Sequence, residues 1–435
     1  MSDKQPIGVV GVGWVGLVTA ACFAELGHRV VARDVIAEKV EALTRGELEF
    51  HEPGLAELVQ RNSERLAFTT DIGEVLDAAE LVFVCVDTPP TESGDADLSS
   101  VLSVVEEFGS GGSQAMVMKS TVPAGTGRTI RRELSGTPYV SCPEFLKEGT
   151  AVEDFMHPDR VVIGADPGDE AAADAVQELY APLGGAVVRT DLTSAEMIKL
   201  ASNAFLAAKI SFINEIANVC DDLGADVNAV AEGMGLDERI GDKFLRAGIG
   251  WGGSCFTKDV SALKQLAANT GYHFQLLNAV IEVNELQKRR VINKLSDRLG
   301  PLSGKRVALL GLAFKPHTDD MRGASSRVLA GRLRGEGAEV VGYDPVAIER
   351  AREVLPEVEM AGSALEALEG ADAAILVTEW PEFSELDWPQ AAERMANPLL
   401  IDGRNFLDPE MLRAAGFAYE GIGRAAPAEL ADTAG

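Results

Sequence analysis

The sequence predicts an α/β protein in which two doubly wound parallel sheets are joined by a central helical region. Short β-branched runs alternate with helical stretches near both ends of the chain. Between them, apolar residues recur at helical spacing from Ile198 to Val219. The length of 435 residues is too great for a single hydrophobic core, so two or three domains are expected.

The composition is typical of a globular protein, with 46% hydrophobic and 25% charged residues. No apolar stretch approaches the roughly 18 residues that span a bilayer, and no signal peptide precedes the first apolar strand. The net charge of -29 repels nucleic-acid backbones and anionic lipid. We therefore expect a cytoplasmic protein that binds neither nucleic acid nor membranes.

The five cysteines are scattered singly through the chain, and the five histidines form no metal-ligand pattern. An odd number of cysteines without a C-x-x-C pair indicates neither a disulfide framework nor a zinc site. We assign no metal.

The elements of the first sheet are apolar, β-branched runs bounded by turn residues. Its strands are expected at Ile7–Gly11, Arg29–Asp34, Leu81–Val86, Ala115–Ser120, Tyr139–Cys142 and Val161–Gly164. A long helix is expected from Ser194 to about Asp222, because apolar residues recur there at spacings of seven, seven, four and three: Ile198, Phe205, Phe212, Ile216 and Val219.

A second helix is expected over Glu282–Leu299, and Gly300, Pro301 and Gly304 then mark a boundary. Strands of the second sheet follow at Arg306–Leu310, Glu339–Gly342, Ala373–Thr378 and Leu399–Asp402. Residues 76–84 and 368–377 echo each other, so the two sheets look internally related. The predicted domains are residues 1–193, 194–302 and 303–435. The tail after about Gly423 is rich in Ala and Pro and is expected to fray.

A glycine motif, Gly11-Val-Gly13-Trp-Val-Gly16, follows the first strand and opens a helix. Such glycines allow a tight turn and the approach of a pyrophosphate to main-chain N–H groups, the pattern of a Rossmann-like sheet. Asp34 ends the next strand, where it would bind ribose hydroxyls and repel a 2′-phosphate. The adjacent Arg33 points to the opposite face. NAD is therefore expected rather than NADP.

A second motif, Gly252-Gly253-Ser254-Cys255-Phe256-Thr257-Lys258-Asp259, places Cys255 at the start of a helix. A helix N-terminus stabilises a thiolate, so we interpret Cys255 as reactive and Cys22, Cys85 and Cys220 as structural. Asp259 lies one turn later on the same face.

Lys199 and Asn203 share one face of the long central helix, where few other charges occur, and we expect a buried polar pair. Two loops, Ser120–Pro123 and Cys142–Gly149, follow strands of the first sheet, at the edge where such sheets bind ligands. The second sheet has Gly311-Leu-Ala-Phe-Lys315 in place of the glycine motif, so a second NAD is not expected. Lys315, Arg322 and Arg404 lie in strand-end loops and could neutralise the phosphates of another nucleotide.

These residues are similar to those of the UDP-glucose/GDP-mannose dehydrogenase family over nearly the whole chain. The matching runs are Gly11–Gly16, Asp34 with Lys39, Glu52–Leu55, Thr88-Pro89, Lys119–Pro123, Pro143–Gly149, Pro158–Val161, Ile198–Asn203, Arg239–Gly241, Gly252–Asp259, Gly311–Lys315, Thr318–Arg322 and Thr378–Trp380.

The resemblance implies a four-electron oxidation of a sugar-nucleotide C6 alcohol to a carboxylate by two NAD+. It implies that Cys255 is the nucleophile and forms first a thiohemiacetal and then a thioester. Lys199, Asn203 and Asp259 would stabilise the oxyanion and activate water, and Thr121 and Glu144 would assist proton transfer and hydrolysis.

The binding residues carried over by resemblance form two sets. The cofactor set is Gly11, Gly13, Gly16, Asp34, Lys39, Thr88, Thr121, Glu148, Lys258 and Arg322. The sugar-nucleotide set is Glu144, Phe145, Leu146, Lys147, Glu148, Lys199, Asn203, Arg239, Phe244, Leu245, Arg246, Ala247, Gly248, Gly252, Lys315 and Arg404. Arg239 would reach the site of a neighbouring subunit, because the family forms dimers through its middle helix.

The chain departs from the family at Asp87 and Gly323, where Gly and Glu are usual. The resemblance favours UDP-glucose as substrate and leaves GDP-mannose, UDP-N-acetylglucosamine and UDP-N-acetylmannosamine as alternatives. A two-electron hydroxyacid dehydrogenase, using Lys199 and Asn203 without a cysteine, and a non-catalytic NAD sensor are the alternatives from other classes.

Overall fold

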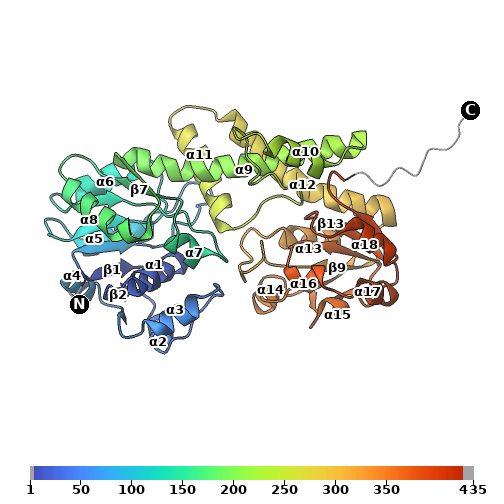
Figure 1. Cartoon of the computed structure of the whole chain (residues 1–435), viewed down its shortest axis with the longest axis horizontal. Coiled ribbons are helices and arrows are strands. Elements are labelled where there is room, and N and C mark those ends of the chain that lie inside the picture. The colour runs from blue at the N-terminus through green and yellow to red at the C-terminus, as the bar shows by residue number, and fades with distance from the viewer. Residues whose placement is uncertain (1–3, 425–435) are drawn as a thin grey trace, which may run out of the picture. The chain divides into compact units, whose positions relative to one another are not determined.

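The computed structural model describes residues 4–424 and divides the chain into two compact units. The first unit comprises residues 1–203 and 258–273, and the second comprises residues 204–257 and the chain from 274 onward. Each unit is built on one sheet, as Figure 1 shows. The predicted fraying of the tail lies outside the described residues, and the three-domain division stays a prediction.

The first unit contains an eight-stranded sheet whose central strands are buried along their whole length. In spatial order its strands are β3 (Leu66–Thr69), β2 (Val30–Arg33), β1 (Ile7–Val10), β4 (Leu81–Val84), β5 (Ala115–Met118), β6 (Tyr139–Ser141), β7 (Arg160–Gly164) and β8 (Ala186–Thr190).

Helices cover both faces of this sheet because side chains of successive strand residues point to opposite sides. Ile7 and Val9 belong to one apolar cluster and Val10 to the other. The first cluster is formed with α1 (Trp14–Glu25), α2 (Ala37–Thr44), α3 (Leu55–Arg61), α7 (Ala151–Met156) and α8 (Glu170–Tyr180). The second is formed with α4 (Ile72–Ala78), α5 (Ser99–Phe108) and α6 (Thr126–Glu133).

The second unit contains a six-stranded parallel sheet. Its strands in order are β11 (Glu359–Met360), β10 (Glu339–Tyr343), β9 (Arg306–Leu310), β12 (Ala373–Leu376), β13 (Leu399–Asp402) and β14 (Ala418–Glu420). Its helices are α10 (Val227–Gly235), α12 (Gln275–Leu299), α13 (Ser325–Gly335), α14 (Ile348–Val354), α15 (Ala364–Leu368), α16 (Pro381–Ser384), α17 (Trp388–Arg394) and α18 (Pro409–Ala414).

Two helices belong partly to each unit. The 32-residue α9 (Leu192–Leu223) leaves the first unit after Asn203, and α11 (Ser254–Asn269) enters it at Lys258. The sequence prediction of a helix from Ser194 to about Asp222 is confirmed by α9.

The two-sheet α/β fold class is confirmed, with one departure from an all-parallel first sheet. β6 pairs with β7 antiparallel, through Ser141 and Gly164. Residues 142–150 form a loop at the edge of the sheet where β6 ends. The next strand, β7, therefore starts near that edge and runs in the direction opposite to β6. The strands β3, β8, β11 and β14 were not predicted, because short or exposed edge strands lack a continuous apolar run.

The three glycines of the first turn serve different purposes. Gly11 has φ 88°, which favours glycine, and a Cβ at Gly16 would lie 1.8 Å from the Gly11 carbonyl oxygen. A Cβ at Gly13 would meet no atom within 4 Å. The turn therefore needs Gly11 and Gly16 in order to fold, whereas Gly13 leaves open space at the N-terminus of α1.

Replacing Gly16 with Ala should destabilise the protein by about 3 kcal/mol or more, because the new methyl group overlaps main-chain atoms. Replacing Gly13 with Ala should leave the melting temperature within about 1 °C and weaken NAD binding instead. Thermal denaturation and NAD+ titration measure the two effects. A Gly16→Ala variant that melts like the wild type would contradict this reading of the turn.

Candidate active site

Asp34 lies at the end of β2, beside the glycine turn. Its Oδ2 accepts a hydrogen bond from the Val12 N–H at 3.0 Å and lies 3.3 Å from Lys39 Nζ. Arg33 points away and pairs with Glu107 at 2.6 Å. No side chain caps the N-terminus of α1. These features suit a dinucleotide, with the pyrophosphate at open Gly13 and a ribose at Asp34, so the residues present fit NAD.

Glu52 is a buried carboxylate that the sequence reasoning did not assign to the site. Oε2 accepts hydrogen bonds from Trp14 Nε1 and the Gly149 N–H, both at 2.8 Å. Oε1 accepts from the Ala151 N–H at 2.9 Å, at the start of α7. Glu52 thus ties the glycine turn to the loop that follows β6. The only indication of Glu52 in the sequence was that the Glu52–Leu55 run is one of those that resemble the family.

A buried polar seam on α9 consists of Glu196, Lys199 and Asn203. Their spacing of three and four residues puts them on one helix face, and each is at most 8% exposed. The expectation that Lys199 and Asn203 form a buried polar pair on one face is confirmed. Each member of the seam contacts a different segment of the first unit.

Lys199 pairs with Glu144, which follows β6, and Nζ lies 2.7 Å from Oε1. The other carboxylate oxygen accepts a hydrogen bond from the Leu146 N–H at 2.6 Å. Burial by itself raises the pKa of Glu144. The Lys199 ammonium and the Leu146 N–H overcome this effect and hold that pKa below its ordinary value. Glu144 is therefore an ionised carboxylate at neutral pH.

Asn203 donates a hydrogen bond from Nδ2 to Asp259 Oδ2 at 2.6 Å. Lys258 Nζ lies 2.5 Å from the other oxygen of Asp259. Asp259 is 1% exposed, so its charge is matched by one cation and one amide donor rather than by water.

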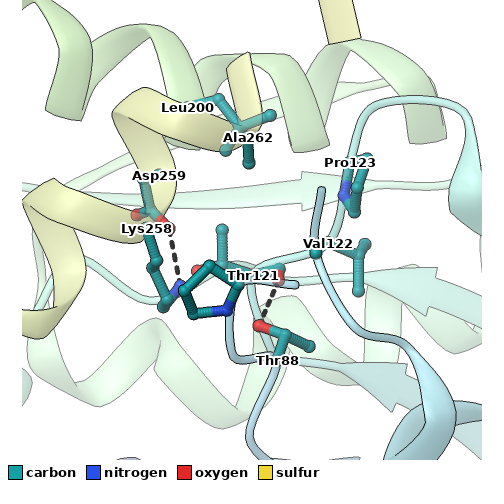
Figure 2. Close-up of a pocket in the computed structure, with 10 residues that line it drawn as sticks. Thr88, Thr121, Val122, Pro123, Leu200, Lys258, Asp259 and Ala262 are labelled. Atoms are coloured by element: carbon teal, nitrogen blue, oxygen red, sulfur yellow. Dashed lines mark hydrogen bonds and ion pairs between the residues drawn. The ribbon is translucent and has the colours of Figure 1, made fainter. Parts of the chain in front are cut away.

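A small pocket in the first unit lies between α9, α11 and the loops after β4 and β5. Figure 2 shows Leu200 and Ala262 above the pocket, Val122 and Pro123 at its right, and Thr121 and Thr88 below. Thr88 Oγ1 donates to the Thr121 carbonyl at 2.8 Å, which fixes the two predicted cofactor residues against each other. Lys258 and Asp259 line one side.

The remaining predicted residues of the loop after β6 are placed at the same sheet edge. The Phe145 ring lies under the Arg160 guanidinium at 3.7 Å and has Lys199 Nζ at 5.5 Å. Lys147 is held through Asp154, with Nζ at 2.8 Å. Glu148 is buried. Ligand roles for Phe145, Lys147 and Glu148 stay predictions.

The second unit holds the other group of predicted residues. Within it the glycine-rich loop before α11 is fixed by buried amides: the Gly248 N–H donates to Asn214 Oδ1 at 2.8 Å, and the Trp251 N–H donates to Asn284 Oδ1 at 2.7 Å. A Cβ at Gly252 would lie 2.3 Å from the Gly323 carbonyl oxygen. These contacts explain why the loop needs small residues and a fixed path.

Gly323, where the family usually has Glu, has a structural reason in this chain. Its φ of 64° and the approach of the Gly253 main chain to 3.1 Å from an ideal Cβ both favour glycine.

Three described non-glycine residues have positive φ: Phe244 (65°), His317 (66°) and Asn405 (51°). All three lie in or beside the loops predicted to bind the sugar nucleotide. Strained backbone of this kind gathers at ligand sites, which supports that prediction. In the 244–248 loop, Leu245 and Ala247 pack into the core while Arg246 is exposed.

The second sheet has its own acidic residue, Asp344, after β10. It is fully buried, and main-chain N–H groups and the Trp380 indole occupy its oxygens. The donors lie at 2.7–3.0 Å and are Leu312, Ala313, Val346 and Ala347 N–H and Trp380 Nε1. A carboxylate enclosed in this way cannot also receive a ribose, which agrees with the expectation of a single NAD.

The predicted phosphate-binding cations differ in how they are held. Arg322 is exposed and paired with Asp320 at 2.9 Å, and Lys315 Nζ lies 5.3 Å from the Phe314 ring centre. Arg404 donates to the Val377 carbonyl at 2.7 Å and to the Gly250 carbonyl at 2.9 Å. Arg404 thus fastens loops of the second unit together. Arg239 is exposed and paired with Asp237. Their ligand roles stay predictions.

The cysteines fall into two classes. Cys22, Cys85, Cys142 and Cys220 are buried, and burial raises the pKa of all four thiols, to about 12 for Cys22 and Cys85. Cys255 is half-buried, and it is the second residue of α11, as predicted. Its position gives it access and the field of a helix N-terminus.

Within residues 4–424, no group of three or more His, Cys, Asp or Glu side chains is arranged to hold a metal ion. Over the same range, no helix combines the length and apolar character required to cross a membrane.

Comparison with known proteins identifies relatives over almost the full length. Residues 5–184, 193–286 and 308–409 match the NAD binding, central and UDP binding domains of the UDP-glucose/GDP-mannose dehydrogenase family. UDP-glucose 6-dehydrogenase TuaD of Bacillus subtilis is 45% identical, over 97% of this chain and 94% of that protein.

Two solved structures have the same fold. A UDP-glucose dehydrogenase from Pyrobaculum islandicum superposes with a TM-score of 0.89 at 39% identity, covering 98% of this chain and 99% of the other. A UDP-D-ManNAc dehydrogenase from Pyrococcus horikoshii gives 0.84 at 28% identity, covering 97% and 100%.

Brief treatment with iodoacetamide at pH 7.5 should modify Cys255 first, because the other four thiols stay protonated and buried. Peptide mass spectrometry identifies the modified residue. Modification of Cys85 or Cys142 before Cys255 in the folded protein would contradict this order.

Replacing Lys199 with Met should lower the free energy of unfolding by about 3–5 kcal/mol at pH 8, because it leaves Glu144 buried without its cation. The cost should shrink towards pH 5: without Lys199 the pKa of Glu144 rises, so the carboxyl group protonates there and no longer needs a partner. Denaturant unfolding at several pH values measures the difference. The Lys199→Met/Glu144→Gln double variant should recover much of the loss, and equal loss at all pH values would contradict the ion pair.

Proposed function

The chain belongs to the UDP-glucose/GDP-mannose dehydrogenase family, and we propose that it oxidises UDP-glucose to UDP-glucuronate with two NAD+. The observation that carries the proposal is the buried Lys199–Glu144 pair next to Asn203 and Asp259, at the ligand edge of a sheet that fits NAD. The TuaD enzyme and the Pyrobaculum islandicum UDP-glucose dehydrogenase are 45% and 39% identical to this chain, against 28% for the UDP-D-ManNAc dehydrogenase. This difference favours UDP-glucose.

The overall reaction converts one primary alcohol, two NAD+ and one water into a carboxylate, two NADH and three protons. NAD+, when bound, accepts a hydride from C6 in each of the two oxidations. The residues of the glycine turn and Asp34 would hold it, with Lys39, Thr88 and Thr121. Because the turn of the second sheet is closed around Asp344, the same site must serve both oxidations.

In the first oxidation the C6–H bond breaks and the hydroxyl proton leaves, giving an aldehyde. Lys199 and Asn203 supply positive charge and an N–H donor for the oxygen, and a polarised oxygen favours proton loss and hydride departure.

The Cys255 thiolate then forms a bond to the aldehyde carbon, giving a thiohemiacetal. This tether explains how the sugar stays bound while NADH is exchanged for NAD+. The second hydride departure produces a thioester. Water adds to its carbonyl carbon, the C–S bond breaks, and Cys255 leaves as a thiolate. Glu144, which stays ionised, is the group suited to accept the proton of that water.

The residues proposed to bind the sugar nucleotide occur in each of the two units. Residues Glu144–Glu148 would hold the sugar. The 244–248 loop with Gly252, Lys315 and Arg404 would hold the UDP group. Arg322 and Lys258 would assist the cofactor.

The protein is proposed to work as a homodimer through α9. Phe205, Phe212 and Val219 recur every seven residues and are at least half exposed, and Leu223 is 78% exposed one turn later. An apolar stripe of this length is typical of a helix that packs against a second helix. Arg239 would complete the partner's site. The expected location is the cytoplasm, where thiols stay reduced.

A panel of UDP-glucose, GDP-mannose and the two UDP-N-acetylhexosamines should yield two NADH per UDP-glucose consumed and much slower turnover of the others. Replacing Cys255 with Ser should lower kcat by at least about a thousandfold while NAD+ binding stays within about twofold. Absorbance at 340 nm counts the NADH. One NADH per substrate, or normal turnover by the serine variant, would overturn the proposed chemistry.

A further inference from the structure

Glu196 is the member of the α9 seam that the proposed chemistry does not use. It lies one helical turn before Lys199, is 2% exposed, and accepts hydrogen bonds from the main chain at the end of the loop after β5 and at the start of α6. Oε2 accepts from the Gly125 N–H at 2.6 Å and Oε1 from the Gly127 N–H at 2.7 Å.

The absence of a side chain at Gly127 leaves room for the Glu196 carboxylate. A Cβ at this position would lie 2.7 Å from Glu196 Oε1 and 2.9 Å from Tyr139 Cε1. Gly125, with φ 99°, forms a left-handed turn immediately before α6. The two glycines thus allow the main chain to approach a buried carboxylate that a larger residue would displace.

The segment that Glu196 holds is a wall of the small pocket. Thr121, Val122 and Pro123 line it opposite α9 and α11, and Thr121 is bonded to Thr88 at the other end (Figure 2). The segment is therefore fastened at two points, to Thr88 and to Glu196. Lys199 leaves the same face of α9 one turn after Glu196.

We infer that Glu196 is a positioning residue for the reaction: it fixes the 121–127 segment in register with Lys199. The inference rests on the proposed function for its kinetic consequence, whereas the contact itself belongs to the described structure. Since a displacement of about 1 Å can cost a hundredfold in rate, a clamp between the cofactor loop and the helix of Lys199 has kinetic value.

The ionisation of Glu196 supplies a signature of this role. Burial raises the pKa of Glu196 to about 7, against the opposing effects of the Gly125 and Gly127 N–H groups and of Arg128, while Asp166 adds to the rise. The Tyr139 hydroxyl, buried on β6, also lies near the carboxylate. The ionised form accepts both N–H donors. Protonation below pH 7 converts one oxygen to a donor and releases one of them.

Ionisation of Glu196 strengthens its hold on the two N–H groups, but it lowers the free energy of unfolding. A carboxyl group whose pKa is raised in the folded state contributes stability at low pH that is lost as the pH rises from about 4.5 to about 7. The wild type should therefore lose stability relative to a Glu196→Gln variant over this range. A carboxyl group whose pKa is lowered in the folded state would show the reverse.

The experiment compares Glu196→Gln and Gly127→Ala with Glu133→Gln, an exposed glutamate on α6, as the matched control. In Glu196→Gln, kcat with UDP-glucose should fall about tenfold or more above pH 7, with KM changed less than about threefold. The wild type should show a rise of kcat through pH 7 as Glu196 ionises, and the variant should lack this rise. Amide exchange at Gly125 and Gly127 should become about tenfold faster.

Gly127→Ala should show the same kinetic loss and add little to Glu196→Gln in the double variant, because both changes remove one contact. Glu133→Gln should behave as the wild type. The inference is overturned if Glu196→Gln keeps the wild-type kcat and its rise through pH 7, or if kcat falls equally at all pH values while amide exchange is unchanged. If the wild type produces no NADH from any sugar nucleotide, the proposed function fails, and amide exchange at pH 6 and 8 alone decides whether Glu196 holds the segment.

Discussion

The site in the first unit depends on a buried salt bridge between Lys199 of α9 and Glu144 of the loop after β6. Either ion alone would cost several kcal/mol at this depth, so neither can be moved or removed independently. The pair keeps Glu144 ionised and holds Lys199 at the edge of the sheet. Asn203 and Glu196 extend this constraint along the same helix face, to α11 and to the loop after β5.

The regular geometry of helix α9 therefore fixes the distances between the residues that contact it. Its regular spacing turns three sequence positions into three contact points, each with a segment far away in the chain: Gly125 and Gly127, Glu144, and Asp259. A rigid helix is more precise in this role than a loop would be. Glu52 does similar work at the other side, because one carboxylate joins the glycine turn to the start of α7.

The two sheets solve the same folding problem with different outcomes. In each, a carboxylate after the second strand accepts main-chain N–H groups from the turn after the first strand, through Asp34 in one sheet and Asp344 in the other. Asp34 keeps an open glycine turn beside it. Asp344 is enclosed by its own donors and by Trp380. With one cofactor site for both oxidations, the proposed covalent tether at Cys255 would hold the sugar between them.

The sequence by itself determined the two-sheet fold, the long helix, the glycine turn with Asp34, the buried Lys199–Asn203 pair and the place of Cys255 at a helix start. These follow from local rules of periodicity, turn chemistry and spacing, which neighbouring residues carry. Only the tertiary structure showed that β7 runs antiparallel to β6. It also showed that the carboxylates of Glu52 and Glu196 and the guanidinium of Arg404 bond main-chain groups of distant segments. Their partners lie tens of residues away, and hydrogen bonds across such distances leave no pattern in a single chain.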